Sequence, residues 1–420
     1  MNKLKEILLE RLSRYAKRKG IGTYIEDFSL RNGISLKNAD IDLYGERVVA
    51  EYSHLKIGKK ALFRKRICID FTCKNFIIMP GRLSEKEFHL TKIEGNVIYD
   101  KPQKELSMTV ILNETIALSL KVLRGCDESE FFIKADHLSI DRYKQLFDGH
   151  ILSRFMRILH SDSPLTILCY YKYDHTSAYP KLNATFQYDS LKIVPDSCIL
   201  SKDYLIGELS RRNHLAKDYK LFGQIPEIIR RTVLCTEDPS FELHKGISPV
   251  LIGMTLRANI EQKALKRGGS TISMQLIKNA LLNGERTFSR KIEEAILTLL
   301  MENYYHVSKQ DVLEIYLNMI ELAPDVYGIE DAARFYFGKP SFELSIVEVL
   351  VLTYIIPRPI HFYEALLQKT EQLRKNLHAH IVQYLNVVVQ KNIISQETVR
   401  SVEIKRIEFT ERFGTLLFEP

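Results

Sequence analysis

The sequence predicts an α+β protein, in which an N-terminal β-rich antiparallel-sheet domain precedes an α-helical domain. Its 420 residues exceed what one hydrophobic core usually holds, so two domains are expected. Apolar residues alternate with polar ones up to about residue 200, and after about Lys202 they recur at helical spacing. We therefore divide the chain into residues 1–22, 23–200, 201–404 and a C-terminal tail, 405–420.

The composition is 45% hydrophobic and 27% charged, which is typical of a folded protein and excludes disordered and collagen-like chains. The net charge of +8 suits an anionic partner, namely a membrane surface, a pyrophosphate or a nucleic acid, without choosing among them. The six cysteines show no CxxC or CxxH spacing, so no metal site of that type and no disulfide is predicted.

Residues 1–22 have the pattern of a basic amphipathic helix without the apolar core of a signal peptide. Such a helix could lie on a membrane surface or pack on the next domain. The longest apolar run, Ile346 to Ile356, contains Glu348 and is far short of the roughly 20 residues that span a bilayer. No transmembrane helix is therefore predicted.

Four segments of the first half show strict alternation: 39–43, 67–73, 116–122 and 182–188. Period-two segments separated by Gly, Pro, Asn and Asp indicate an antiparallel sheet with one apolar face. A helical interlude is expected over Asp141 to Leu159. This half gathers no catalytic residue types, so a scaffold or spacer is expected and its role stays unknown.

The second half predicts a series of helices. Pro226 is expected in the first turn of one, and Ser308 followed by Asp311 is typical of a helix start. The further predicted helices are Thr271–Leu282, Arg290–Tyr305, Lys309–Met319, Ile329–Phe337 and Ser345–Ile356.

The stretch CTEDPSFELHKG places two adjacent carboxylates, Glu237 and Asp238, at the end of an apolar helical pattern that Pro239 breaks. Taken alone, the pair has two interpretations: the solvated last turn of a helix, or the acid–base group of an active site.

The stretch RGGSTISMQLIKN combines two glycines with Ser270 and Thr271, either of which can cap the helix that follows. Free amides at that helix start, with Lys278 about two turns on, would suit a phosphate oxyanion. Glycine before a capped helix is also ordinary turn chemistry, so this pattern alone does not decide.

In ERTFSRKIEEAILTLLME, Arg290 and Glu294 are four residues apart and share one helix face. A surface ion pair would explain them, but Glu294 borders an apolar stripe that would partly desolvate it. Two further stretches, VLEIYLN and YGIEDAARFYFGK, carry Asn318, Ala332, Ala333 and Gly338, which we interpret first as close-packing choices.

Five ordered motifs, EDPSFELHKG, GGSTISMQLIKN, RKIEE, VLEIYLN and GIEDAARFYFGK, resemble those of the peptidoglycan glycosyltransferases, glycosyltransferase family 51. The closing IELAPDVYGIEDAARFYFGK and IIPRP are most similar to the monofunctional biosynthetic transglycosylases. The resemblance runs from about Phe222 to about Ile404. It implies a lysozyme-like helical fold with an apolar jaw, here at 247–256, that touches the membrane. The first half resembles AsmA-like envelope modules only in its strand rhythm.

The resemblance assigns roles to residues. It implies that Glu237 is the catalytic base and that Glu294 helps to position the pyrophosphate or the donor sugar. Asp238 would support Glu237, and His244 would shape the loop that follows. The polar lining of the substrate cleft is implied to comprise Gly269, Ser270, Thr271, Gln275, Lys278, Asn279, Arg286, Arg290 and Lys291.

The implied reaction is polymerisation of lipid II into β-1,4 glycan strands with release of polyprenyl pyrophosphate. The partners would be lipid II, the growing glycan strand, the membrane surface and other cell-wall synthesis proteins. No cofactor is required by the sequence, although a divalent cation such as Mg²⁺ could assist pyrophosphate departure. The implied location is the outer face of the bacterial cytoplasmic membrane, and the family's membrane anchor is expected to be missing from this chain.

The sequence also departs from the family pattern. Ser273-Met274-Gln275 replaces the usual Thr-Gln-Gln, which we expect to cost one amide in the cleft, and Thr298 stands where Ala is common. Three alternatives remain: a non-catalytic envelope scaffold that binds lipid II or other lipids, a glycan-cleaving muramidase, and a nucleic-acid-binding protein. The cation set of the GGST and RKxxE motifs weighs against the muramidase, and no basic-aromatic module supports nucleic acid.

Overall fold

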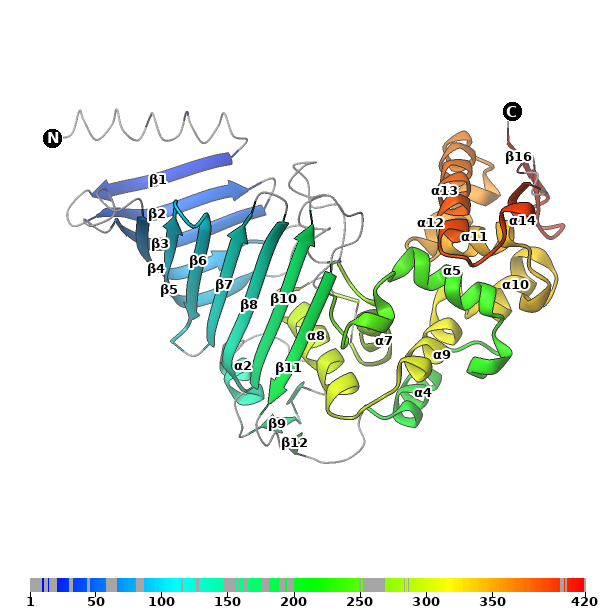
Figure 1. Cartoon of the computed structure of the whole chain (residues 1–420), viewed down its shortest axis with the longest axis horizontal. Coiled ribbons are helices and arrows are strands. Elements are labelled where there is room, and N and C mark those ends of the chain that lie inside the picture. Colours follow the sequence, from blue (N-terminus) through cyan, green and yellow to red (C-terminus); the bar gives the residue numbers. More distant parts are fainter. Residues whose placement is uncertain are drawn as a thin grey trace. The chain divides into compact units, whose positions relative to one another are not determined.

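The computed structural model describes most of the chain (Figure 1). The described residues are 10, 14, 21–29, 33–43, 46–57, 66–80, 87–114, 116–125, 128–146, 156–157, 159–161, 165–174, 181–188, 193–194, 200–248, 251, 269–282, 284–285, 287–400, 404 and 406–418. The predicted N-terminal amphipathic helix lies outside them except for Glu10 and Arg14, which are helical and form an ion pair of 3.1 Å.

The chain divides into two compact units. The first comprises residues 1–197, 243–269 and 283–299, and the second comprises 198–242, 270–282 and 300–420. Two segments of the predicted domain 201–404 thus group with the first unit. In that unit, the buried Tyr143 lies near Glu293, which helps to explain why the start of the helix at 288 belongs there.

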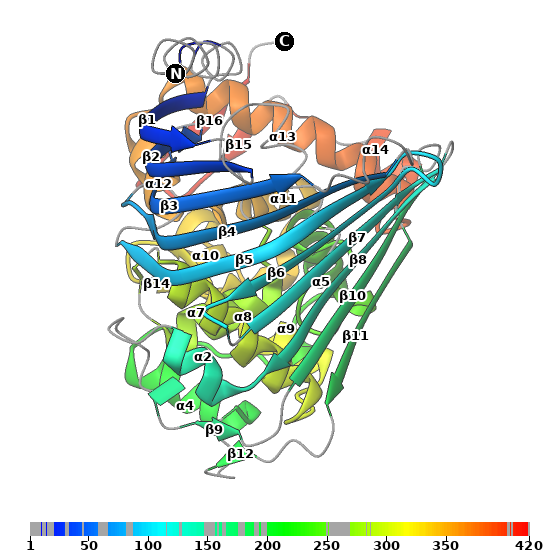
Figure 2. The same cartoon turned by 90° about the vertical axis from the view of Figure 1, so that its left-hand side faces the viewer.

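The first unit is built on a ten-stranded antiparallel sheet in which nearly every strand pairs with the next one along the chain (Figure 2). Its strands, in spatial order, are β1 Ile21–Ser29, β2 Ile34–Leu43, β3 Glu46–Ile57, β4 Arg66–Ile78, β5 Phe88–Asp100, β6 Glu105–Leu112, β7 Ile116–Arg124, β8 Glu128–Leu138, β10 Leu165–Asp174 and β11 Lys181–Tyr188. All four alternating segments of the sequence lie in these strands, so that prediction is confirmed.

A short excursion interrupts the meander between β8 and β10. It contains helix α2, Ile140–Leu146, within the predicted helical interlude, and strand β9, His160–Ser161, which pairs with β12, Ile193–Val194. Helix α2 buries Ile140 and Tyr143 almost completely. This apolar face explains why the short helix is stable where it stands.

The second unit is helical (Figure 1). Its elements before residue 320 are α4 Lys202–Arg211, η2 Phe222–Gln224, α5 Glu227–Glu237, η3 Phe241–Leu243 at the unit boundary, α7 Ile272–Leu281, the end of α8 Phe288–Asn303, and α9 Lys309–Met319. Those after it are β13 Glu321–Ala323, β14 Val326–Tyr327, α10 Ile329–Phe337, η4 Ser341–Glu343, α11 Ile346–Ile355, α12 Pro359–Leu367, α13 Glu371–Gln390, α14 Gln396–Arg400, β15 Arg406–Glu408 and β16 Thr415–Leu417.

The five predicted helices after residue 270 are confirmed with boundaries within two residues. Side-chain caps explain this agreement. Thr271, Ser308 and Ser345 each accept a hydrogen bond from the backbone N–H three residues on, which satisfies a donor that the helix leaves free. Among the described residues no single helix is long and apolar enough to cross a membrane; α11 and α12 pass that test only together, with a bend of 115° between them.

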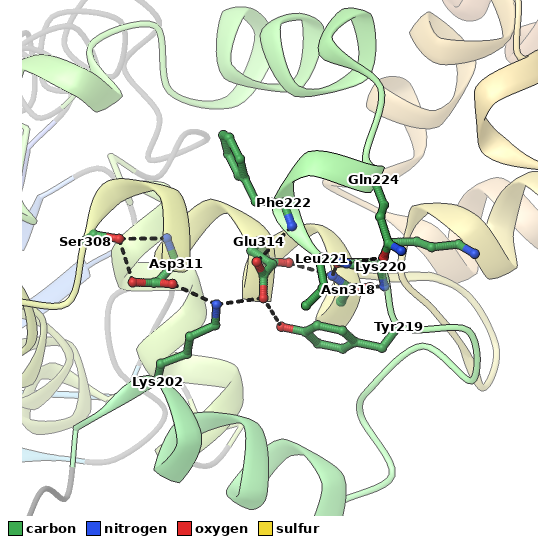
Figure 3. Close-up of polar contacts among 10 residues, drawn as sticks. All are labelled: Lys202, Tyr219, Lys220, Leu221, Phe222, Gln224, Ser308, Asp311, Glu314 and Asn318. Atoms are coloured by element: carbon green, nitrogen blue, oxygen red, sulfur yellow. Dashed lines mark hydrogen bonds and ion pairs between the residues drawn. The ribbon is translucent and has the colours of Figure 1, made fainter.

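A buried carboxylate on α9 fixes the segment that leads into α5 (Figure 3). Glu314 is 3% exposed and accepts hydrogen bonds from the Tyr219 hydroxyl at 3.0 Å and the Phe222 N–H at 2.8 Å. The Lys202 ammonium lies 2.8 Å from the same carboxylate. One turn on, the Asn318 side-chain amide donates to the Lys220 carbonyl at 2.8 Å and accepts from the Lys220 N–H at 2.8 Å. These bonds hold residues 219–222 against α9.

The last described residues, 406–418, form the β15–β16 hairpin in the part of the sequence that we had described as a tail. Phe413 is 2% exposed and packs edge-on against Phe335 of α10, and the Thr410 N–H donates to the Tyr336 carbonyl at 2.8 Å. The apolar residues of this segment therefore extend the core of the helical unit.

Gly328 caps the start of α10 and is required there by its backbone. Its φ is +78°, and a Cβ at this position would lie 2.7 Å from the Ala216 Cβ and 3.0 Å from the Asn318 carbonyl oxygen. We expect Gly328→Ala to lower the free energy of unfolding by about 1–3 kcal/mol, as measured by urea denaturation.

Gly338 provides the matched control for this prediction. It has a similar φ of +70°, but its nearest neighbour to an added Cβ is a Thr410 methyl group at an ordinary 3.5 Å. Gly338→Ala should therefore lose stability through backbone strain at positive φ, but without a steric clash. Equal losses in the two variants would show that the close approach at Gly328 contributes nothing.

Candidate active site

The carboxylate pair lies at the carboxyl end of α5. Glu237 is the last residue of that helix and Asp238 is its C-cap, with φ −150° and ψ 74°, which turns the chain away from the helix axis. Asp238 is fully buried and accepts hydrogen bonds from the Ile272 N–H at 3.1 Å and the Ser240 hydroxyl at 3.4 Å. Its carboxylate thus ties the start of α7 to the end of α5, so the pair is not a solvated helix end.

Gln275, on α7, faces Glu237 with its side-chain amide and hydrogen-bonds to that carboxylate. The hydroxyl of Tyr316, on α9, donates to the other end of the same amide, Gln275 Oε1, at 3.2 Å. Tyr316 is fully buried. Three helices therefore meet at Glu237, and each supplies one polar group.

A partly buried cation, Lys309, interacts with Asp238 of the pair. The Lys309 ammonium lies 2.8 Å from Glu302 and 4.3 Å from the centre of the Phe241 ring. Ser273 donates its hydroxyl to the same Glu302 carboxylate. Burial lowers the pKa of Lys309, while the charge of Glu302 opposes that shift. The field of this ammonium also reaches Asp238, whose charge it helps to balance.

The environment of Glu237 alters its acidity. Burial raises the pKa of Glu237 to about 7, a hydrogen bond from Gln275 works in the opposite direction, and the charge of Asp238 raises it further. Its side chain nevertheless keeps some accessible surface. A partly accessible carboxylate that titrates near neutral pH can take a proton from a hydroxyl group and release it again.

The second predicted acid, Glu294, lies on the part of α8 that belongs to the first unit. Its side chain is 1% exposed and forms ion pairs with Arg290, at 2.7 Å, and with Lys291. Arg290 is largely buried, whereas 42% of the Lys291 side chain is exposed. Glu294 therefore holds two cations. The sequence spacing predicted that Arg290 shares its helix face, whereas the ion pair with Lys291 was not predicted.

The other predicted residues fall into these two groups. Thr271 caps α7 with its hydroxyl, which accepts from the Met274 N–H at 3.1 Å, and Asn279 donates to the Met319 sulfur at 3.4 Å. In the first unit, the Nδ1 atom of the buried His244 accepts from the Gly246 N–H at 3.2 Å and shapes that turn. Asp238, Ser270, Thr271, Gln275, Lys278 and Asn279 share the second unit with Glu237, whereas His244, Gly269, Arg290 and Lys291 share the first with Glu294.

Some predictions lie outside the described residues. Arg286 is one, and of the predicted jaw, 247–256, only Ile247, Ser248 and Leu251 are described. Within the described part of the chain, no group of three or more His, Cys, Asp or Glu side chains is arranged to hold a metal ion.

Comparison with known proteins decides the family. A model described as Transglycosylase matches residues 203–384. Over 173 residues the chain is 40% identical to a biosynthetic peptidoglycan transglycosylase of Nitrosomonas eutropha. The aligned region covers 40% of this chain and 68% of that protein. The chain belongs to the transglycosylase family. It is a glycosyltransferase of peptidoglycan synthesis, and it acts in the cell envelope.

Other relatives support the same assignment. The transglycosylase is 34% identical over 187 residues to the biosynthetic peptidoglycan transglycosylase of Nitrosomonas europaea, which is 44% of this chain and 70% of that protein. It is 40% identical over 144 residues to penicillin-binding protein 1A of Aquifex aeolicus, which is 34% of this chain but 20% of that protein. The family match begins after the last strand of the ten-stranded sheet, which it leaves outside.

Sequence reasoning missed three residues of the candidate site. Tyr316 lies in the VLEIYLN motif, which we interpreted as packing, and Glu302 and Lys309 were not singled out. The departure at Met274 is also clarified: this side chain is 4% exposed and belongs to the core face of α7, while the amide that faces Glu237 is that of Gln275. Helical spacing was the signal that could have found Tyr316. It lies two residues after Glu314, so the two side chains point to different faces of the helix.

The raised pKa of Glu237 predicts a pH-dependent stability difference. Between pH 4.5 and about 7 the folded transglycosylase retains a proton on Glu237 that the unfolded chain releases, so folding becomes less favourable as pH rises through this window. The loss amounts to about 3 kcal/mol at roughly 1.4 kcal/mol per unit. Glu237→Gln carries no such titration, and we expect it to gain stability relative to the wild type over this range and to level off above it.

Urea unfolding of both proteins at several pH values measures this difference without any substrate. Parallel pH dependences of the two proteins would contradict the prediction. A gain in the variant would show that the buried carboxylate of Glu237 lowers the stability of the wild type.

Proposed function

We propose that this transglycosylase polymerises lipid II into β-1,4 glycan strands, with Glu237 as the general base. The 4-hydroxyl of the acceptor N-acetylglucosamine attacks the anomeric carbon of the lipid-linked N-acetylmuramic acid. A C–O bond forms as the bond to the polyprenyl pyrophosphate breaks, and the hydroxyl proton passes to Glu237. A single displacement inverts the configuration at that carbon.

The observation that carries this proposal is the environment of Glu237. A base works best when its pKa lies near the operating pH, and the pKa of Glu237 is raised to about 7 by burial at the end of α5. Gln275 holds the carboxylate in place, and the buried Asp238 fixes the turn that follows. Such positioning lets the base meet the acceptor hydroxyl in one geometry.

The leaving pyrophosphate needs positive charge. In our proposal Glu294 serves this need indirectly, because its carboxylate orients Arg290 and Lys291. The start of α7, where Ser270 precedes the N-cap Thr271, adds the positive end of the helix dipole, which favours an anion. Assistance by a divalent cation such as Mg²⁺ is an open part of the proposal that the assay tests.

A lipid-linked substrate also implies work at a membrane. We place the enzyme at the outer face of the cytoplasmic membrane, with the apolar segment 247–256 in contact with lipid. The support is the composition of that segment, in which apolar residues outnumber polar ones.

The test is glycan formation from labelled lipid II in detergent, with and without Mg²⁺, resolved by gel electrophoresis. We expect a ladder of products that a β-1,4-specific muramidase digests. If the protein binds lipid II but forms no polymer, even when fused to a membrane anchor, the proposal fails and a non-catalytic envelope scaffold replaces it.

A further inference from the structure

We propose that Tyr316 is a positioning residue of the glycosyl transfer, which holds the Gln275 amide with its NH₂ group toward Glu237. The inference rests on the proposed role of Glu237 as the base. Tyr316 lies on α9, which packs against α7, and its hydroxyl is fully buried. This hydroxyl donates a hydrogen bond of 3.2 Å to Gln275 Oε1.

A glutamine amide has two unlike ends of almost the same shape, an acceptor oxygen and a donor NH₂ group. Because the Tyr316 hydroxyl donates to the oxygen, the NH₂ group is the end that faces the Glu237 carboxylate. The reversed amide would place its oxygen against the carboxylate and repel the ionised form. The tyrosine therefore selects the amide orientation that favours an ionised base.

Among the groups around Glu237 in the second unit, Gln275 is important for the balance between the ionised and protonated forms of Glu237. Asp238 is adjacent along the chain, and Tyr316 approaches from α9. Lys309, at the start of α9, is paired with Glu302 and also interacts electrostatically with Asp238 and Glu242. Burial and the charge of Asp238 both disfavour the ionised Glu237, and the Gln275 amide opposes them.

The test uses Tyr316→Phe, which removes only the hydroxyl. Without it the amide can rotate, so the acid limb of the pH–rate profile should move to higher pH by about one unit. Such a shift means that the rate falls about tenfold at pH 6 and much less at pH 9, because one pH unit is a factor of ten in proton binding.

Three comparisons make the result specific. Tyr336→Phe is the matched control, because Tyr336 is equally buried and donates to the Leu322 carbonyl at 2.8 Å, away from Gln275. It should leave the acid limb in place. Gln275→Leu should shift the limb in the same direction, and adding Tyr316→Phe to it should move the limb no further.

A second readout needs no turnover. In protein carrying ¹³C-labelled glutamate, the carboxyl signal of Glu237, assigned by its loss in Glu237→Gln, should titrate about one unit higher in Tyr316→Phe. This titration answers the question even if lipid II polymerisation fails, so failure of the proposed function and failure of this inference are distinguishable.

Should Tyr316→Phe not fold, 3-fluorotyrosine at position 316 keeps the shape of the side chain and makes its hydroxyl a stronger donor. The acid limb of the fluorinated protein should lie at or below that of the wild type. An unchanged titration in Tyr316→Phe, an equal shift in Tyr336→Phe, or a raised limb in the fluorinated protein would overturn the proposal.

Discussion

Glu237→Gln should lower the rate of glycan polymerisation by about 10²–10⁴-fold while the protein stays folded and still binds lipid II. The substitution keeps the size of the side chain and its hydrogen bond with Gln275, but it removes the group that accepts the proton. The residual rate would come from the bound geometry of donor and acceptor and from the charges that stabilise the leaving group. Initial rates with labelled lipid II, together with a binding measurement on each protein, test this.

Glu242→Gln is the control for this prediction. Glu242 lies five residues further on, in η3, and is exposed, so the same chemical change there should leave the rate within about twofold. If Glu237→Gln retained more than about a tenth of the wild-type rate, Glu237 would not be the base. A loss of both binding and rate would instead point to a role in holding substrate.

Replacing Glu314 by Leu should lower the free energy of unfolding of the helical unit by about 3–5 kcal/mol. The carboxylate accepts from the Tyr219 hydroxyl and the Phe222 N–H and pairs with Lys202 (Figure 3). Its removal takes away the acceptor of two partly buried donors, while Lys202 keeps its ion pair with Asp311 at 2.7 Å. Chemical denaturation followed by the helical circular-dichroism signal measures the loss.

Two further variants test whether the stability loss in Glu314→Leu comes from the lost hydrogen bonds and ion pair of Glu314. Glu314→Gln keeps one acceptor oxygen and should cost clearly less than Glu314→Leu. Glu343→Leu, at an exposed residue of η4, should change stability by about 0.5 kcal/mol or less. A loss in Glu314→Leu no larger than that of the Glu343 variant would mean that the network contributes little to stability.

The helix boundaries were predictable because their determinants are local. Ser308 was expected to cap α9, and the structure shows its hydroxyl accepting from the Asp311 N–H at 3.1 Å. Ala332 and Ala333 are fully buried, as their interpretation as packing residues predicted. Asn318, interpreted in the same way, instead bonds through its amide to the backbone of Lys220, almost a hundred residues earlier. A contact at that separation leaves no periodic trace in the sequence.

The sequence by itself determined the α+β class and the family, and it predicted Glu237 and Glu294 as site residues, because ordered motifs, strand alternation and helix caps are all properties of short segments. Tertiary structure alone decided which groups surround these acids. It brought Gln275 and Tyr316 to Glu237 from two other helices, and it set the partly buried Lys309 within electrostatic range of Asp238. The physical reason is that a pKa depends on desolvation and on neighbouring charges, and both arise only when distant segments pack together.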